Sequence, residues 1–121
     1  MSKPTNSSAQ PSVQHGWFYF KQSDSGNLIG EYGHEYSPLG VYTESGEFVK
    51  GDQDILKNPN AKNAEFESTW MDPNTTPTWG KLEVERNGRI FKVKWSYKTG
   101  PLFEGKGILC DGVLIGEFHA A

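Results

Sequence analysis

Apolar and polar residues alternate in short runs along most of the chain, a pattern that predicts β-strands rather than helices. Turn-forming residues separate the runs, and no segment sustains a helical period. The sequence therefore predicts an all-β fold, an antiparallel meander of eight to nine strands that closes toward a small barrel. The predicted strands are 16–22, 27–33, 39–44, 47–51, 63–70, 79–86, 89–97, 102–110 and 113–119.

The sequence Asn87-Gly88 is typical of a two-residue hairpin turn, because both central residues of a type I′ turn need a positive φ. A turn at these two residues would pair Val84 with Phe91 and Leu82 with Val93. One face of the hairpin would then be apolar throughout. Further turns are predicted at 24–26 and 45–46, with longer loops over 51–62 and 71–78.

Asp111-Gly112 predicts a second hairpin of the same kind, with Cys110 opposite Val113. In this register Gly107 faces Gly116, so part of one face has no side chains. Glycine inside a strand indicates strong bending or the close approach of another group. The strip therefore predicts either a barrel corner covered by rings from elsewhere or room for a ligand.

The first fifteen residues are mostly Ser, Pro, Asn, Gln, Thr and Lys, with Val13 as the only branched aliphatic residue. Such a segment cannot bury enough apolar surface to offset the entropy of ordering. We therefore expect a disordered tail over 1–15 and a single barrel domain over 16–121.

Charge and composition narrow the class of protein. The formal net charge is −3, with 12 Lys and Arg against 15 Asp and Glu, so the basic surface of a nucleic-acid-binding protein is not expected. The single cysteine, Cys110, cannot form an internal disulfide. No apolar stretch is long enough for a signal peptide or a membrane span, which predicts a cytoplasmic protein. No phosphate- or dinucleotide-binding fingerprint occurs, so no cofactor is expected.

Two short motifs and the strand pattern resemble a known group of barrels. Gly16-Trp17 is similar to the Gly-x-Trp opening of lipocalins, and residues 28–32, Leu-Ile-Gly-Glu-Tyr, are similar to the second strand of avidin-like proteins. The chain thus resembles the calycin-type barrels, the lipocalin and avidin group. The resemblance implies an intracellular relative with a cup-shaped interior. It assigns no ligand-binding residues.

Aromatic residues make up 13% of the chain and dominate the faces that would line a closed barrel. A barrel of about eight strands either fills with side chains or holds one small ligand, and the sequence leaves both open. If the barrel holds a ligand, the predicted ligand-binding residues are Tyr32, His34, Trp79, Phe91, Trp95, Tyr97 and Phe118.

No catalytic or metal-binding residue is assigned from the sequence. His34 and His119 each lie just past a predicted strand, and these two strands have similar sequences. If the two strand ends were neighbours, the histidines would form a metal or acid–base site with Glu31 or Glu117; otherwise they are surface histidines. The alternation along the strands predicts that most glutamates lie on the solvent face. The glutamates considered are Glu31, Glu35, Glu44, Glu65, Glu67, Glu83 and Glu104.

Three classes of function remain open on the sequence alone. The first is binding of a small apolar or aromatic molecule inside the barrel. The second is a structural or protein-interaction domain, a homodimer through the first strand with Trp17 and Phe18 at its interface. The third is a small barrel enzyme, an isomerase or hydrolase that would use pocket Tyr, His and Glu side chains.

Overall fold

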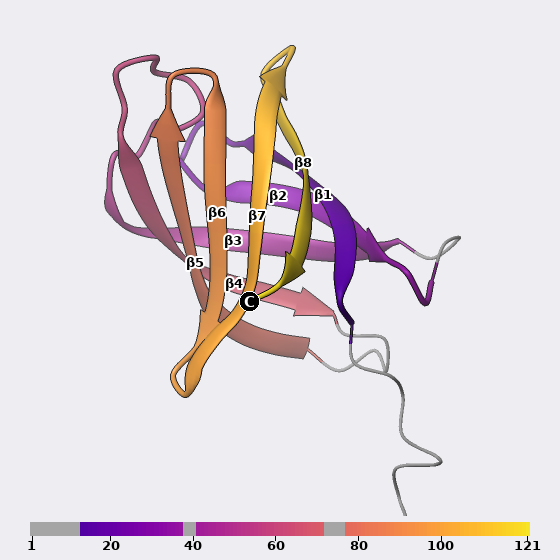
Figure 1. The fold of residues 1–121 in the computed structure, drawn as a ribbon. Coiled ribbons are helices and arrows are strands. Elements are labelled where there is room, and N and C mark those ends of the chain that lie inside the picture. The colour runs from indigo at the N-terminus through magenta and orange to yellow at the C-terminus, as the bar shows by residue number, and fades with distance from the viewer. Residues whose placement is uncertain (1–12, 38–40, 72–76) are drawn as a thin grey trace, which may run out of the picture.

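The computed structural model describes residues 13–37, 41–71 and 77–121, which form a closed barrel of eight antiparallel strands in chain order (Figure 1). Each strand pairs with the next, and β8 pairs with β1, which confirms the predicted all-β meander and its closure. In the described ranges no helix is long and apolar enough to cross a membrane. The strands are β1 (His15–Gln22), β2 (Leu28–His34), β3 (Tyr42–Gly51), β4 (Asn63–Met71), β5 (Pro77–Asn87), β6 (Ile90–Tyr97), β7 (Gly100–Cys110) and β8 (Val113–Ala120).

Three predicted segments fall partly outside the described residues: residues 1–12 of the predicted tail, 39–40 of the predicted strand over 39–44, and 72–76 of the predicted loop. Within the described part, Val13 already packs against the core, and β1 begins at His15. The strand over 63–70 is confirmed as β4, which pairs with both β3 and β5.

The hairpin of β7 and β8 has the predicted turn and register. Cys110 pairs with Val113 and Gly107 with Gly116. Asp111 and Gly112 have φ angles of 53° and 81°, the positive values that a type I′ turn requires.

The predicted register of the β5–β6 hairpin is wrong. Asn87 pairs with Ile90, so the central residues of the turn are Gly88-Arg89, and only the glycine has a positive φ, of 66°. Glycine at the first central position is the arrangement of a type II′ turn. Val84 consequently faces Val93. The register differs from the prediction by an even number of residues, so the predicted apolar face survives unchanged.

The predicted turn at residues 45–46 is also wrong, because β3 runs through it as one strand. Gly46 faces the interior, where a Cβ atom would lie 3.2 Å from the Cβ of Phe66. The glycine thus permits close packing inside the barrel rather than a chain reversal. Because β3 continues, Tyr42, Glu44, Gly46 and Phe48 share its inner face, and Glu44 is an exception to the predicted solvent-facing glutamates.

Residues 52–62, between β3 and β4, close one end of the barrel. Ile55 is fully buried and Leu56 is 3% exposed, so both belong to the core. Arg86 Nη1 donates to the Ile55 carbonyl oxygen at 3.2 Å, and its guanidinium lies 4.9 Å from the centre of the Phe91 ring. We call this the capped end.

Burial decreases from the capped end toward the opposite end, where β6 turns into β7 (Figure 1). Nine inner side chains between the cap and the middle of the barrel are at most 1% exposed, namely Phe18, Phe20, Leu28, Phe66, Leu82, Val84, Phe91, Val93 and Leu114. In the same half Ala64 is 4% exposed, and Phe48 and Leu109 are partly buried. Near the opposite end Trp95, Phe118 and Trp70 are 5%, 6% and 8% exposed. The barrel is therefore filled at the capped end and less completely filled at the other, which we call the open end.

If the cap is part of the core, truncating its central side chain should be costly. We expect Ile55→Ala to lower the free energy of unfolding by about 2–5 kcal/mol, the usual cost of removing a fully buried aliphatic side chain. Val49→Ala, at a position 53% exposed on β3, is the matched control and should cost less than about 1 kcal/mol. Urea denaturation of the two variants measures both values, and equal losses would show that the cap is not a structural part of the barrel.

Candidate functional site

The open end of the barrel contains a small interior cavity of about 30 Å³. A water molecule needs about 10–15 Å³ by this measure, so the space suits one or two waters or a small chemical group. Strands β2, β3, β4, β6, β7 and β8 each contribute one side chain to the cavity wall. The lining residues are Tyr32, Glu44, Trp70, Trp95, Phe103 and Phe118.

Glu44 is the only residue in this lining with a carboxyl group, and two hydrogen bonds fix that group. Ser68 Oγ and Trp95 Nε1 both donate to Glu44 Oε2, at 2.6 and 2.7 Å. These bonds link β3 to β4 beside it and to β6 across the interior. No described residue donates a hydrogen bond to the second carboxyl oxygen, Oε1, which leaves this oxygen available to a group in the cavity.

Burial raises the pKa of Glu44 to about 7 from an ordinary value of 4.5. The hydrogen bonds from Ser68 and Trp95 favour the ionised form, but they offset only part of the desolvation cost. The carboxyl group therefore changes its charge close to neutral pH. A group of this kind can receive a cation when ionised, donate a hydrogen bond when protonated, or transfer a proton.

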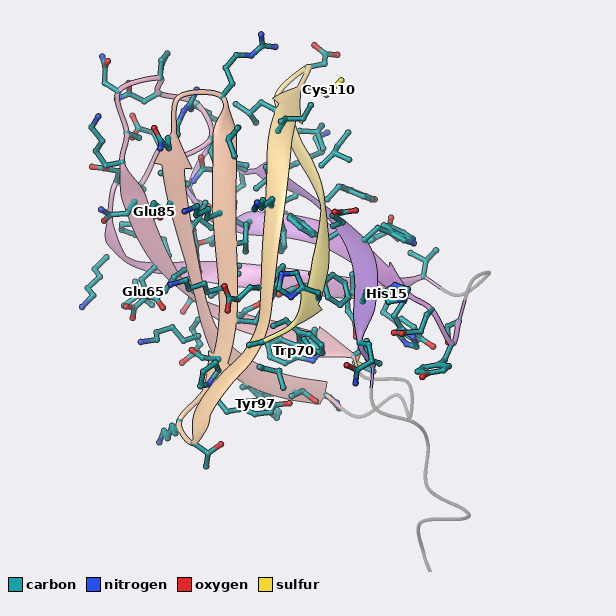
Figure 2. The ribbon with its side chains drawn as sticks, in the orientation of Figure 1. His15, Glu65, Trp70, Glu85, Tyr97 and Cys110 are labelled. Atoms are coloured by element: carbon teal, nitrogen blue, oxygen red, sulfur yellow. The ribbon has the colours of Figure 1, made fainter. Side chains whose placement is uncertain are left out.

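Aromatic rings at varied angles form the rest of the cavity wall. Phe118 is central: the rings of Tyr32, Phe103 and Trp95 lie 6.4, 5.1 and 5.7 Å from it, at interplanar angles of 71°, 68° and 60°. Trp70 stacks on Tyr97 at 6.0 Å, and the two residues lie at the same end of the barrel (Figure 2). Edge-to-face and tilted arrangements of this kind are the preferred geometries of aromatic pairs.

His34 is buried one ring away from the cavity. Its imidazole stacks on Tyr42 at 5.5 Å, and the Tyr42 ring lies 5.4 Å from that of Tyr32. The Tyr36 backbone N–H donates to Nδ1, which places the proton of a neutral ring on Nε2, and Nε2 has no partner among the described residues. Burial lowers the pKa of His34, so the neutral form is favoured.

The structure brings some of the predicted ligand-binding residues together and separates others. Tyr32, Trp95 and Phe118 line the cavity, and His34 lies just behind it. The remaining three lie elsewhere: Phe91 is in the filled half, Tyr97 is at the rim with 39% exposure, and Trp79 is 60% exposed on the outer face. Trp79 borders a surface groove of about 820 Å³ between β4 and β7.

The two histidines that were considered as a joint site do not meet. His34 is buried on the inner face, whereas His119 is exposed and pairs with His15 across the β8–β1 seam. The described part of the chain contains no group of three His, Cys, Asp or Glu side chains placed to hold a metal ion.

Four cavity-associated residues were missed by the sequence reasoning, and the hydrophobic pattern could have found them. Reading residues 42–48 as one strand places Glu44 on the face of Tyr42 and Phe48. The same period of two places Ser68 and Trp70 with Phe66 on β4. Phe103 shares the inner face of β7 with Gly105 in the same way. What the sequence does not reveal is that Glu44, Ser68 and Trp95 meet.

Comparison with known proteins adds no assignment: no family model, curated protein or solved structure matches this chain.

The burial of Glu44 predicts a specific pH dependence of stability. A carboxyl group whose folded pKa is raised costs nothing below its unfolded pKa of 4.5; its cost grows as the pH rises from 4.5 to about 7 and is constant above that. Relative to Glu44→Gln, the wild type should therefore lose about 3 kcal/mol of unfolding free energy between pH 4.5 and pH 8. Urea denaturation at both pH values measures the difference.

The matched control for this prediction is Glu67→Gln, on the exposed face of β4. It should leave the pH dependence of the wild type unchanged. Glu44→Gln retains His34, so any contribution of this histidine cancels in the comparison. A difference between wild type and Glu44→Gln that is the same at both pH values would contradict the raised pKa of Glu44.

Proposed function

We propose that the open end of the barrel binds a small, largely aromatic or apolar molecule that presents one polar group to Glu44. The proposal rests on one observation: a cavity, five aromatic rings and a buried carboxyl group with an unengaged oxygen occur at the same place. Small-molecule sites combine an apolar, concave wall with a few well-placed polar groups in this way. The calycin-like resemblance points to the same use of a barrel interior.

The observed volume limits how a ligand enters. Ligand pockets usually measure about 300–1,000 Å³, far more than the 30 Å³ seen here. Only a polar head group fits the cavity without movement, so the bulk of a ligand must displace side chains at the mouth. Tyr32 and Phe103 are half-buried there, whereas Phe20, Phe66 and Phe91 toward the cap are fully buried. We therefore expect these two rings to move when a ligand binds.

Binding is better supported than catalysis by an isomerase or hydrolase. Glu44 has a pKa suited to proton transfer, but a reaction needs further groups placed around the reacting atoms. The other cavity-lining residues are five aromatic side chains, of which only Tyr32 has a hydroxyl group. That hydroxyl donates to the Met71 carbonyl oxygen.

The four tryptophans provide a test that includes its own controls. In a ¹H–¹⁵N spectrum, small aromatic probes such as benzyl alcohol should shift the indole N–H signals of Trp70 and Trp95, which line the cavity. The signals of Trp17 and Trp79, 41% and 60% exposed on the outside, should stay in place. Trp→Phe variants assign the signals. A shift of the Trp79 signal alone would place the site in the outer groove, and no shift at all would contradict the proposal.

A second candidate function, self-association, is favoured by a row of exposed apolar side chains. Ile90, Ile108, Ile115 and Tyr19 are successive cross-strand partners on β6, β7, β8 and β1. The three isoleucines are 48–53% exposed. A continuous apolar row on an outer face is typical of an interaction surface. Since such a row matches itself in a twofold arrangement, we also propose a second copy of this chain as its partner.

The charges beside the row agree with a twofold partner. Lys106 and Glu117 are cross-strand partners on β7 and β8. Each lies two residues along its strand from the isoleucine of the row, Ile108 or Ile115, and so on the same face. In an isologous interface each lysine can approach the glutamate of the other copy. The expected interface on β1 is partly wrong, because Phe18 is fully buried against Trp95, and only Trp17 is exposed.

Light scattering coupled to gel filtration tests this second candidate. The wild type should have twice the 13.5 kDa chain mass at micromolar concentration, and Ile115→Lys should reduce it to the chain mass. Val49→Lys, equally exposed on β3 away from the row, is the control and should remain dimeric. A wild-type protein that is monomeric at high concentration would exclude this function.

A further inference from the structure

We propose that the polar group received by the cavity is a primary or monomethylated ammonium group, so that the ligand is a small organic amine. This inference rests on the proposed binding function and specifies its ligand class. It is carried by the chemistry of the cavity wall, five aromatic rings and one carboxyl group, which we call the amine cage: Tyr32, Glu44, Trp70, Trp95, Phe103 and Phe118.

The aromatic part of the amine cage favours a cation. The face of an aromatic ring carries negative electrostatic potential, which attracts an ammonium group and repels an anion. Tyr32, Trp95 and Phe103 each stand at 60–71° to Phe118, so the rings that line the space lie in different planes. Cages of this composition serve to recognise alkylated ammonium groups. A neutral apolar group would bind here as well, but it would gain nothing from the carboxyl group.

Glu44 supplies the single hydrogen-bond acceptor that an ammonium N–H requires. Oε2 is already occupied by Ser68 Oγ and Trp95 Nε1, which fixes the orientation of the carboxyl group. Oε1 receives no hydrogen bond from any described side chain or backbone group. A charge-assisted N–H to carboxylate bond in a site of low dielectric constant is stronger than the same bond in water. Binding of a cation would also compensate the carboxylate charge, which has no cationic partner among the described residues.

The volume of the cavity limits how many alkyl groups the ammonium nitrogen can carry. About 30 Å³ accommodates an ammonium or methylammonium head group, whereas a quaternary ammonium group would need the rings to separate. The rest of the molecule must extend toward the mouth, past Tyr32 and Phe103. The class that fits is therefore a primary or monomethylated amine with a short aromatic or aliphatic chain.

The charge state of Glu44 makes amine binding dependent on pH. With a pKa of about 7, the carboxyl group is mostly protonated at pH 6 and mostly ionised at pH 8, and the ionised fraction rises about tenfold. The groups that face Glu44 are Ser68 of β4, Trp95 of β6 and Tyr32 of β2. The Ser68 hydroxyl and the Trp95 indole do not titrate between pH 6 and pH 8. His34, also of β2, lies behind Tyr42 and Tyr32. Amine affinity should rise with pH, whereas that of a neutral analogue should not.

Three probes of similar size and different charge test the inference on the full chain: benzylammonium, benzyl alcohol and benzoate. The Trp95 indole N–H signal reports occupancy. At pH 8 we expect benzylammonium to bind at least tenfold more tightly than benzyl alcohol, and benzoate to bind least. At pH 6 benzylammonium should bind about tenfold more weakly than at pH 8.

Glu44→Gln should abolish both the preference for benzylammonium and its pH dependence, while benzyl alcohol binding persists. Glu67→Gln, on the exposed face of β4, should behave as the wild type. Equal affinity for benzylammonium and benzyl alcohol, or tighter binding of benzoate, would overturn the amine inference and leave the binding function standing. If none of the three probes shifts the Trp95 signal at millimolar concentration, the proposed binding function fails together with the inference.

Discussion

A carboxyl group placed among aromatic rings, with no cationic partner in the described part of the chain, is the interaction on which the rest of this structure depends. Desolvation of Glu44 raises its pKa to about 7, and the two donors that hold Oε2 only partly offset this cost. A barrel that contains such a group needs a well-packed core elsewhere. The capped end provides it, since Ile55 and nine inner side chains between the cap and the middle of the barrel are at most 1% exposed. The two ends thus have different roles, one stabilising the barrel and the other holding the polar site.

Closure of the barrel explains why an interior carboxyl group is tolerated at all. Because β8 pairs with β1, the backbone groups of both outer strands are satisfied in the ladder, and the lumen has to accommodate side chains only. Glycines on the inner face adjust the space. A Cβ atom on Gly105 would lie 2.7 Å from the Glu117 carbonyl oxygen and 3.1 Å from a ring carbon of Phe18. At Gly105 neighbouring rings therefore occupy the room that a side chain would take, whereas at Gly107 the nearest side-chain atom is Leu114 Cδ1, at 2.9 Å.

The fold could be predicted from the sequence almost completely, whereas the site could be predicted only in part. Alternation and turn chemistry are local signals, and they identified the strands, the Asp111-Gly112 turn and the closing meander. They failed at residues 45–46, where a Ser-Gly pair is equally compatible with a turn and with a close interior contact to Phe66. That single error concealed the inward orientation of Glu44. The meeting of Glu44 with Ser68 and Trp95 depends on barrel curvature and register, which local patterns do not encode.

The buried carboxylate and the aromatic rings of the open end together explain why a cationic ligand fits this interior better than an apolar or an anionic one. An apolar guest would fill the cavity but leave the Glu44 carboxylate desolvated, with hydrogen bonds from Ser68 and Trp95 but no cation beside it. An anionic guest would require a protonated carboxyl group and would still meet the negative faces of the rings. A cation relieves the burial cost of the carboxylate and interacts favourably with the rings, so both features of the wall act in the same direction. The feature that destabilises the empty barrel near neutral pH is therefore the one that provides affinity when an amine is bound.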